Sequence, residues 1–311
     1  MDIKRESFLK KIDYLETVGS KSTYRSQDIG PGLFKKLKRL LFYRGFYLKK
    51  IWEQSGLMPE KDVYIQTFWG RGITLPNRDL NARKIFKHGI LGKGEQSLIR
   101  FFIKNFKSND IFYDIGTNYG FYTALAQEFI YEGEIHSFEP NTHVFKYLQQ
   151  LEENYDNTLL NKLACSDVND EVTFFDGYSK HKSGKSTLMS EVAEKNHMQT
   201  QEVVVKATTL DDYTERHKIP TIIKIDVEGS EYKVLNGAKK TLREHSPVIA
   251  IELWRGEGSR FSKKNLEILK EFHYKPHTIS TIGEIREIKY EVLKENLAVI
   301  GPETNFIFKK N

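Results

Sequence analysis

The stretch that most constrains the fold is IFYDIGTNYGFYT, residues 111–123. A short apolar run leads into Asp114, and Gly116 and Gly120 follow before a helical pattern opens. This order predicts a strand, a tight turn and a helix, because glycine permits positive φ and lets the backbone approach a ligand closely. The helix N-terminus also offers unpaired N–H groups. The pattern favours a cofactor site, although such turns also occur for packing alone.

Two carboxylates restrict the kind of cofactor. Asp114 would place a negative charge beside the phosphates of a dinucleotide, which is unfavourable. Glu139 follows a second predicted strand, at about the offset where such folds place a carboxylate on ribose hydroxyls. S-adenosylmethionine carries a sulfonium, an ammonium and a ribose but no phosphate, and it fits both acids. The alternatives are a helix N-cap for Asp114 and a solvated strand end for Glu139.

Composition and charge narrow the class of protein. The 311 residues suffice for one large or two modest domains, and they are 29% charged and 39% apolar. No run of eighteen apolar residues predicts a membrane span, and the charged N-terminus lacks the apolar region of a secretory signal. The lone Cys165 excludes an intrachain disulfide and agrees with a reducing compartment. We predict a soluble, cytoplasmic protein.

Positive charge is concentrated in KKLKRLLFYRGFYLKK, residues 35–50, within a chain of net charge +6. Lys and Arg interleaved with aromatic residues suit an acidic glycan, a nucleic-acid backbone or peripheral contact with an anionic membrane surface. The alternative is an amphipathic helix whose leucines pack inward while its lysines extend to solvent.

Two regions are predicted along the chain, with a boundary near residues 89–94. Residues 1–90 form an accessory region of helical pieces, broken at 28–32, and a strand pair at 62–76. Residues 91–311 alternate strands with helices, which predicts a mostly parallel sheet covered on both faces. The predicted order is helix 95–106, strand 111–115, helix 119–130, strand 134–138, helix 141–154, strand 159–164, an irregular or β-rich insertion, helix 209–217, strand 221–226, helix 230–243, strand 247–252, and terminal edge strands at 272–279 and 304–309.

The segment SGKST, residues 183–187, ends like a phosphate-binding P-loop. The glycine required five positions before Gly184 is Ser179, and no apolar strand precedes it. We therefore predict a mobile polar loop over the cofactor.

A second acidic stretch, TIIKIDVEGSE, covers residues 221–231. In extended chain Lys224, Asp226 and Glu228 share one face at the carboxyl end of a strand, where open α/β sheets bind ligands. A buried lysine requires a partner, so an ion pair with one of the acids is expected. The functional reading is a general base, a metal ligand or a clamp on a substrate hydroxyl, and the alternative is a structural ion pair. Glu252 ends the next strand and could converge there, with Asp226 and Glu252 as candidate ligands of a divalent metal.

Six segments in this order resemble the FkbM-type methyltransferases, over roughly residues 92–255. They are DIGTNYGFYT at 114–123, FEPN at 138–141, ACSD at 164–167, SGKSTL at 183–188, TTLDDY at 208–213, and IKIDVEGSE at 223–231 with IELW at 251–254. The resemblance implies a class I methyltransferase fold, a Rossmann-like seven-stranded sheet with helices on both faces. It also implies S-adenosylmethionine-dependent O-methylation, often of sugar or polyketide hydroxyls.

By matching position, the resemblance implies a set of cofactor-binding residues. Around the methionine part these are Asp114, Gly116, Asn118, Gly120, Phe121 and Tyr122; at the ribose Glu139, with Pro140 and Asn141 beside it; and at the adenine edge Ser166 and Asp167. Residues 1–90 lie outside the match and are assigned to acceptor selection.

Methyl transfer to a hydroxyl requires alignment of acceptor oxygen, methyl carbon and sulfur, and removal of the hydroxyl proton. Asp226 is the first candidate base, held ionised by Lys224, and Glu228 is the next. His181 is a further candidate, but a lone histidine on a polar loop is usually solvated.

Three other functions remain open at this stage. An RNA methyltransferase agrees with the sequence pI of about 9.0. A dinucleotide-dependent oxidoreductase is disfavoured by Asp114. A non-catalytic binding module would make the basic region the working part and the sheet a scaffold.

Overall fold

A computed structural model describes residues 2–22, 61–153, 155–177, 183–195, 201–299 and 304–310. The chain divides into two compact units. The first comprises Met1–Arg78 with Ala82–Ile90, and the second Asp79–Asn81 with Leu91–Asn311. The turn predicted at 28–32 and the basic segment 35–50 lie outside the described residues. No described helix is both long enough and apolar enough to span a bilayer.

The first unit contains helix α1 (Ile3–Ser22) and the antiparallel strands β1 (Asp62–Gln66) and β2 (Gly72–Pro76), which confirm the strand pair predicted at 62–76. Helix α3 (Leu80–His88) begins at the end of the short segment assigned to the second unit. Within the first unit, the ring of Phe8 on α1 stacks on Trp69, with centroids 6.1 Å apart.

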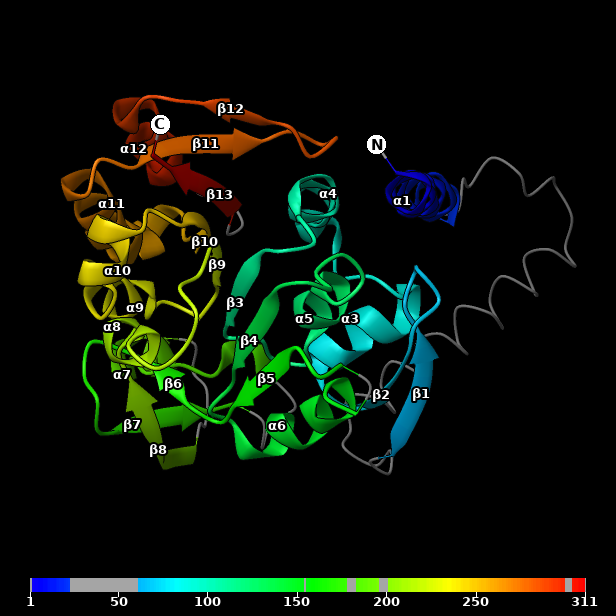
Figure 1. Cartoon of the computed structure of the whole chain (residues 1–311), viewed down its shortest axis with the longest axis horizontal. Helices are drawn as coiled ribbons and strands as arrows, with labels where there is room; N and C mark the ends of the chain where they lie inside the picture. Colours follow the sequence, from blue (N-terminus) through cyan, green and yellow to red (C-terminus); the bar gives the residue numbers. More distant parts are fainter. Residues whose placement is uncertain are drawn as a thin grey trace, which may run out of the picture. The chain divides into compact units, whose positions relative to one another are not determined.

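The second unit is built on an eight-stranded sheet in the order β12-β11-β13-β10-β9-β3-β4-β5 (Figure 1). Strands β5 to β10 in this order are parallel, whereas β13 is antiparallel to both of its neighbours and β12 is antiparallel to β11. The prediction of an α/β domain with a mostly parallel sheet is confirmed. The strands are β3 (Ile111–Ile115), β4 (Glu134–Phe138), β5 (Thr158–Asn161), β9 (Ile222–Ile225), β10 (Val248–Leu253), β11 (Lys275–Ile279), β12 (Ile285–Glu287) and β13 (Thr304–Lys309).

Helices cover both faces because β3 is buried at every position. On one face Phe112 contacts Phe102 of α4, and on the other Tyr113 contacts Tyr213 of α8. The helices of this unit are α4 (Gln96–Asn105), α5 (Phe121–Ala126), α6 (Thr142–Leu148), α7 (Ser190–Lys195), α8 (Leu210–Thr214), α9 (Glu231–Asn236), α10 (Lys239–Glu244), α11 (Ser259–Glu271) and α12 (Tyr290–Ala298).

The two terminal strands were predicted as edge strands, and this is wrong. β13 inserts between β10 and β11, and the edge on that side is β12, which the sequence patterns did not predict. Three consecutive buried residues, Phe306, Ile307 and Phe308, are typical of an interior strand, whereas β12 is mostly exposed.

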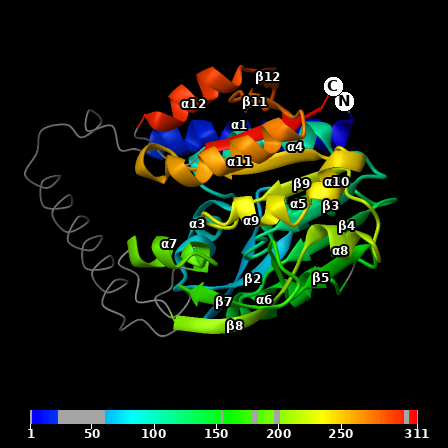
Figure 2. The same cartoon turned by 90° about the vertical axis from the view of Figure 1, so that its left-hand side faces the viewer.

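The predicted β-rich insertion is a separate three-stranded sheet in the order β6-β8-β7. It lies at the opposite end of this unit from β11 and β12 (Figures 1 and 2). The strand predicted at 159–164 is divided, since residues 158–161 join the large sheet and Ala164–Cys165 join the small one. The small sheet comprises β6 (Ala164–Cys165), β7 (Glu171–Asp176) and β8 (Gln201–Thr208).

The helix predicted at 230–243 is also divided, into α9 and α10. Gly237 ends α9, and a Cβ atom at this position would lie 2.0 Å from the carbonyl oxygen of Ser166. The break therefore lets the chain pass close to the segment after β6.

Candidate functional site

A pocket with an empty volume of about 610 Å³ lies at the carboxyl ends of β3, β4 and β9. Its lining includes six of the predicted site residues: Gly116, Asn118, Glu139, Pro140, Asp226 and Glu228. Leu163, Phe174 and Leu188 supply an apolar part of the wall. Three turns that are far apart in sequence therefore meet at one cavity, at the sheet edge where open α/β folds bind ligands.

Gly116 lies where the turn after β3 touches the turn after β9. Its φ is +76°, and a Cβ atom would lie 2.0 Å from the carbonyl oxygen of Asp226. The amide nitrogens of Gly116 and Thr117 both donate to the carbonyl oxygen of Phe138 at the end of β4. The glycine thus meets a packing requirement as well as lining the pocket.

Gly120, Phe121 and Tyr122 are not among the residues that line this pocket. Gly120 has φ of +75°, and a Cβ atom there would meet the side chains of Leu151 and Leu148. Phe121 and Tyr122 open α5 with 3% and 4% exposure. This part of the motif packs the helix against its surroundings.

Glu139 is a buried carboxylate in the pocket wall. One oxygen, Oε2, accepts a 3.0 Å hydrogen bond from the amide of Asn118, and Oε1 accepts a 2.9 Å bond from the amide of Asn141. Burial raises the pKa of Glu139 to about 7, although both amide donors oppose the shift. Asn141 caps α6 with its side-chain oxygen, which receives the amides of His143 and Val144.

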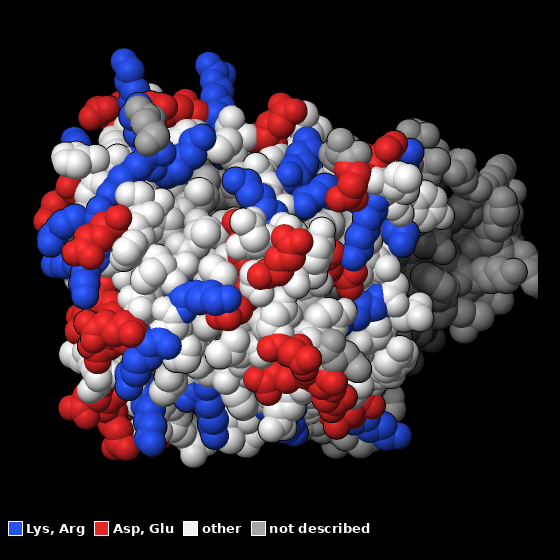
Figure 3. Space-filling view, in the orientation of Figure 1, with Lys and Arg blue, Asp and Glu red and all other residues white. Residues whose placement is uncertain are grey.

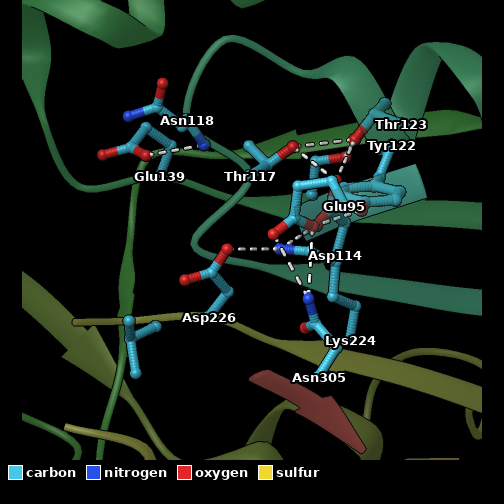
Figure 4. A network of polar contacts seen from close by, with 12 residues as sticks. Glu95, Asp114, Thr117, Asn118, Tyr122, Thr123, Glu139, Lys224, Asp226 and Asn305 are labelled. Atoms are coloured by element: carbon cyan, nitrogen blue, oxygen red, sulfur yellow. Dashed lines mark hydrogen bonds and ion pairs between the residues drawn. The ribbon is translucent and has the colours of Figure 1, made fainter. Parts of the chain in front are cut away.

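Asp114 is fully buried and lies beneath the glycine turn (Figure 4). Its Oδ2 accepts hydrogen bonds from Thr117 and Thr123, at 2.6 and 2.8 Å. Its Oδ1 lies 3.8 Å from the ammonium nitrogen of Lys224. The positive charge that the sequence argument expected from a ligand is therefore supplied by a lysine of the chain itself.

Lys224 and Asp226 form the ion pair predicted from their spacing, with Nζ 3.1 Å from Oδ2 (Figure 4). Lys224 is 3% exposed, and its ammonium also faces the ring of Tyr122, 5.0 Å from the centroid. Burial alone would lower the pKa of Lys224, but Asp226, Asp114 and Glu95 outweigh it and raise the pKa above its usual value. Asp226 keeps 31% side-chain exposure and faces the pocket.

Glu228 adopts positive φ, 52°, at the rim of the same pocket. Its Oε2 lies 3.2 Å from Nζ of Lys185, and its carbonyl oxygen accepts a 2.8 Å bond from the hydroxyl of Thr187. Burial raises the pKa of Glu228, and the nearby charge of Asp226 adds to the shift while Lys185 opposes it.

Residues 183–188, here called the strap, lie over the pocket as predicted and line it. They are tied down, because the amide and hydroxyl of Ser183 both donate to the carboxylate of Asp79, at 2.8 and 2.9 Å. The same hydroxyl accepts a 3.2 Å bond from the side-chain amide of Asn118. Asn118, with φ of 50°, and Glu228 are thus both strained residues held by the strap.

Ser166 and Asp167, predicted at the adenine edge, follow β6 and do not line this pocket. Ser166 is 1% exposed, and its hydroxyl donates to Asp167 at 3.0 Å. The neighbouring Cys165 does line the pocket. His181 lies outside the described residues.

Glu252 follows Ile251, which pairs with Ile225 of β9, so Glu252 and Asp226 end adjacent strands. Burial raises the pKa of Glu252, and the charges of Asp226 and Glu228 add to the shift. Within the described part of the chain, no group of three or more His, Cys, Asp and Glu side chains could hold a metal ion. Asp226 and Glu252 therefore lack the further ligands that a metal site requires.

The sequence patterns missed Glu95 and Asn305, which are part of the same buried network. Glu95 precedes α4 and accepts a 2.6 Å hydrogen bond from the hydroxyl of Tyr122. Asn305 of β13 donates to both of its oxygens, at 3.2 and 3.3 Å. The two residues are 210 positions apart, and neither lies in a motif; the signal that could have found Asn305 is the register of β13, which pairs it with Glu252.

Comparison with known proteins decides the family. The sequence model of the Methyltransferase FkbM domain matches residues 114–288, more than half of the chain. The chain belongs to the FkbM methyltransferase family. Its strand order, with antiparallel β13 between β10 and β11, confirms the class I methyltransferase fold that the resemblance implied. The eighth strand, β12, extends the seven-stranded sheet at one edge.

Individual relatives of this FkbM family member are distant. The chain is 23% identical over 171 residues to the hexuronic acid methyltransferase AglP of Haloferax volcanii, a match that covers 53% of this chain and 64% of AglP. A crystal structure of the methyltransferase FkbM from Methylobacillus flagellatus has 16% identity and a TM-score of 0.41, over 66% of this chain and 44% of that one. An S-adenosylmethionine-dependent O-methyltransferase of Thermotoga maritima has 11% identity and a TM-score of 0.40, over 80% and 77%. The chain spans less than two thirds of AglP.

Proposed function

We propose that this protein is an S-adenosylmethionine-dependent O-methyltransferase that acts on a hydroxyl of a sugar or glycan. The observation that carries the proposal is one pocket in which Glu139, suited to a ribose, and Asp226, suited to a reacting hydroxyl, both face the cavity. Membership of the FkbM family supports methyl transfer. The name of AglP, hexuronic acid methyltransferase, supports a sugar acceptor.

The pocket residues fit S-adenosylmethionine. Each oxygen of Glu139 accepts one backbone amide, and a carboxylate oxygen has a second lone pair that can accept a ribose hydroxyl. Leu163, Phe174 and Leu188 offer apolar contact to a purine ring. Gly116 and Asn118 line the side on which the methionine part would lie, while Asp114 would act beneath them, through Thr117 and Lys224.

When bound, S-adenosylmethionine supplies an activated methyl group on a sulfonium. The protein must orient the acceptor oxygen and take its proton as attack proceeds. Asp226 is placed for this role, because Lys224 holds Oδ2 while Oδ1 makes no hydrogen bond with any described residue. Glu228 is the second candidate, and its pairing with Lys185 of the strap makes it less free to approach a hydroxyl.

The remaining assignments are proposals of the same kind. Residues 1–90 would select the acceptor and residues 91–311 would carry the methyltransferase domain. The basic segment 35–50 would contact an anionic acceptor or the surface of a membrane, and the protein would be cytoplasmic. Liposome partition of the wild type and of a variant with Lys35, Lys36, Lys38 and Arg39 changed to Gln tests the membrane contact, which requires a salt-sensitive loss in the variant.

RNA as the acceptor has less support. On the face shown in Figure 3, the described Lys and Arg side chains are interspersed with Asp and Glu, whereas a nucleic-acid surface concentrates positive charge. The dinucleotide and binding-module alternatives are answered by ligand binding alone.

Calorimetry with S-adenosylhomocysteine, NAD and buffer is the first experiment, and binding of S-adenosylhomocysteine alone is expected. Transfer of a labelled methyl group to neutral glycans, hexuronic acid glycans and RNA then identifies the acceptor. NAD binding would support an oxidoreductase, and transfer to RNA alone would overturn the sugar assignment. A product stable to mild alkali is an ether on a hydroxyl, whereas an alkali-labile one is an ester of a uronic carboxylate.

A further inference from the structure

A buried hydrogen-bonded cluster lies behind Asp226, on the side away from the glycine turn. Its centre is Glu95, whose carboxylate receives the hydroxyl of Tyr122 at 2.6 Å and the amide of Asn305 at 3.2 and 3.3 Å. These residues come from the segment before α4, from α5 and from β13 (Figure 4). Three elements that do not belong to the acidic stretch 221–231 therefore meet at one carboxyl group.

The cluster reaches Asp226 through Lys224. The ring of Tyr122 lies 5.0 Å from the ammonium of Lys224, which in turn bonds Oδ2 of Asp226 at 3.1 Å. Asp114 is the second carboxylate near this ammonium, at 3.8 Å, a distance too long for a hydrogen bond. The position of the Tyr122 ring consequently limits where the lysine can lie between Asp226 and Asp114.

The protonation states agree with this direction of bonding. Burial raises the pKa of Tyr122 well above its usual value, and the charge of Glu95 adds to the shift, so the phenol is a donor. Burial also raises the pKa of Glu95, and Asp226 adds to it, while the bonds from Tyr122 and Asn305 and the charge of Lys224 oppose it. Glu95 accepts the phenol proton through Oε2 in either state.

We propose that Glu95 is a positioning residue for Asp226. By fixing the hydroxyl of Tyr122, it holds the ring against Lys224, keeps the ammonium on Oδ2 of Asp226 and leaves Oδ1 to face the acceptor. The kinetic part of this inference rests on the proposed methyltransferase function. Glu95 itself touches neither acceptor nor cofactor.

The test is a double-mutant cycle with Glu95→Ala and Tyr122→Phe. Each single variant should lower kcat by about tenfold, and the double variant by no more than about tenfold, because both changes remove the same contact. Affinity for S-adenosylhomocysteine should stay within about twofold. Glu95→Gln retains an oxygen that can accept the phenol and should restore kcat to within about threefold of wild type.

Glu132→Ala is the matched control. Its carboxylate accepts a hydroxyl bond from Ser108 at the same 2.6 Å, but in the loops before β3 and β4, at the other end of the sheet. It should leave kcat unchanged. Cooperative thermal unfolding shows that each variant is folded, and Asn305→Ala replaces Glu95→Ala in the cycle if the latter does not fold.

Multiplicative losses in the double variant, a parallel loss of S-adenosylhomocysteine affinity, or a Glu95→Gln variant as slow as Glu95→Ala would overturn the proposal. A crystal structure of Tyr122→Phe provides a readout without catalysis. The inference requires the Lys224 ammonium to leave Oδ2 of Asp226 or to become disordered, and an unchanged contact would contradict it. A wild-type protein that transfers no methyl group would instead count against the proposed function, and this structural comparison would still decide the role of Glu95.

Discussion

Asp226 combines two properties that are seldom found on one side chain, a fixed partner and access to a cavity. Lys224 occupies one carboxylate oxygen, and 31% of the side chain remains exposed. The backbone of Asp226 is also fixed, since its amide donates to the carbonyl oxygen of Ile115. A carboxylate held at both its side chain and its backbone can be aimed at a substrate without costly reorganisation.

Asp226→Asn should therefore lower turnover more than cofactor affinity. Asparagine preserves shape but cannot take a proton, so kcat should fall by about a hundred- to ten-thousandfold. Affinity for S-adenosylhomocysteine, measured by calorimetry, should change by less than about threefold. Near-normal turnover would make Asp226 structural and turn attention to Glu228 and Glu252. Activity that returns only with added divalent cation would favour a metal ligand.

Glu139→Ala tests the ribose contact. The variant loses a hydrogen bond from a charged group, so affinity for S-adenosylhomocysteine should weaken by about 1.5–3 kcal/mol, about ten- to a hundredfold. Glu139→Gln keeps one acceptor oxygen and should bind more tightly than Glu139→Ala. Unchanged affinity in a folded Glu139→Ala protein would remove this residue from the site.

Local patterns predicted the residues of the site that lie on strand ends. Lys224 and Asp226 are two positions apart on one strand, so the alternation of side chains was enough to pair them. The environment of Asp114 was not predictable in the same way. Its neighbour Lys224 is brought close by the parallel pairing of β3 with β9, which sets residue 114 opposite residue 224.

At the scale of elements, the strap joins two strained turns that would otherwise be independent. Ser183 binds Asn118 of the turn after β3, and Lys185 with Thr187 binds Glu228 of the turn after β9. Because the strap lines the pocket, its attachment should control how fast a cofactor leaves.

Asp79→Asn should speed that release. Asparagine has one acceptor oxygen where Asp79 uses two, so either the amide or the hydroxyl of Ser183 loses its partner. Weakening of a charged hydrogen bond by about 1.5 kcal/mol corresponds to roughly a tenfold faster dissociation of S-adenosylhomocysteine in stopped-flow measurements. Asp170→Asn, which removes an exposed carboxylate on the amide of Glu171, is the control. Equal release rates in all three proteins would show that the strap does not limit release.

Gly116→Ala tests the contact between the turns after β3 and β9. The new Cβ would lie 2.0 Å from a backbone oxygen, and positive φ disfavours alanine. We expect a loss of about 2–4 kcal/mol in the free energy of unfolding, with weaker binding of S-adenosylhomocysteine. Gly94→Ala is the control, since a Cβ atom added there would meet nothing within 4 Å. A Gly116→Ala protein as stable as wild type would mean that the two turns can separate at little cost.

Sequence patterns predicted the strand and helix order of the second unit, but not how its last strands are placed. The pattern of 304–309 indicates a strand and cannot say which neighbours it pairs with. Insertion of β13 between β10 and β11 depends on pairing across some fifty positions, for example Ile251 with Phe306. The same limit explains why Glu95 was missed, because its partners come from α5 and β13.

At the scale of the whole molecule, the carboxyls gathered at one end of the sheet should govern how stability depends on pH. Burial raises the pKa of Glu139 to about 7, and it raises that of Glu231 to about 7 as well. In Glu231 the amide bonds from Gly229 and Val227 oppose the shift. The pKa values of Glu228, Glu252 and Glu95 are raised for the same first reason.

The sign of the effect follows from proton binding. Between about pH 4.5 and 7 these carboxyls hold protons in the folded protein and have lost them in the unfolded chain, so folding is progressively less favoured as pH rises. Their contribution is fully present below about pH 4.5 and is lost through about pH 7.

Glu231→Gln isolates one of these groups. The variant has no proton to lose, so its free energy of unfolding relative to wild type should increase by about 1–3 kcal/mol between pH 4.5 and 7.5. Glu134→Gln is a control of opposite sign. Although burial would raise the pKa of Glu134, its bonds with Lys218 and His136 lower it overall, so its effect is confined to more acidic pH and its difference from wild type should stay flat between pH 5 and 8. Denaturant unfolding across this range measures both differences, and a flat difference for Glu231→Gln would show that Glu231 ionises in the folded protein as easily as in the unfolded chain.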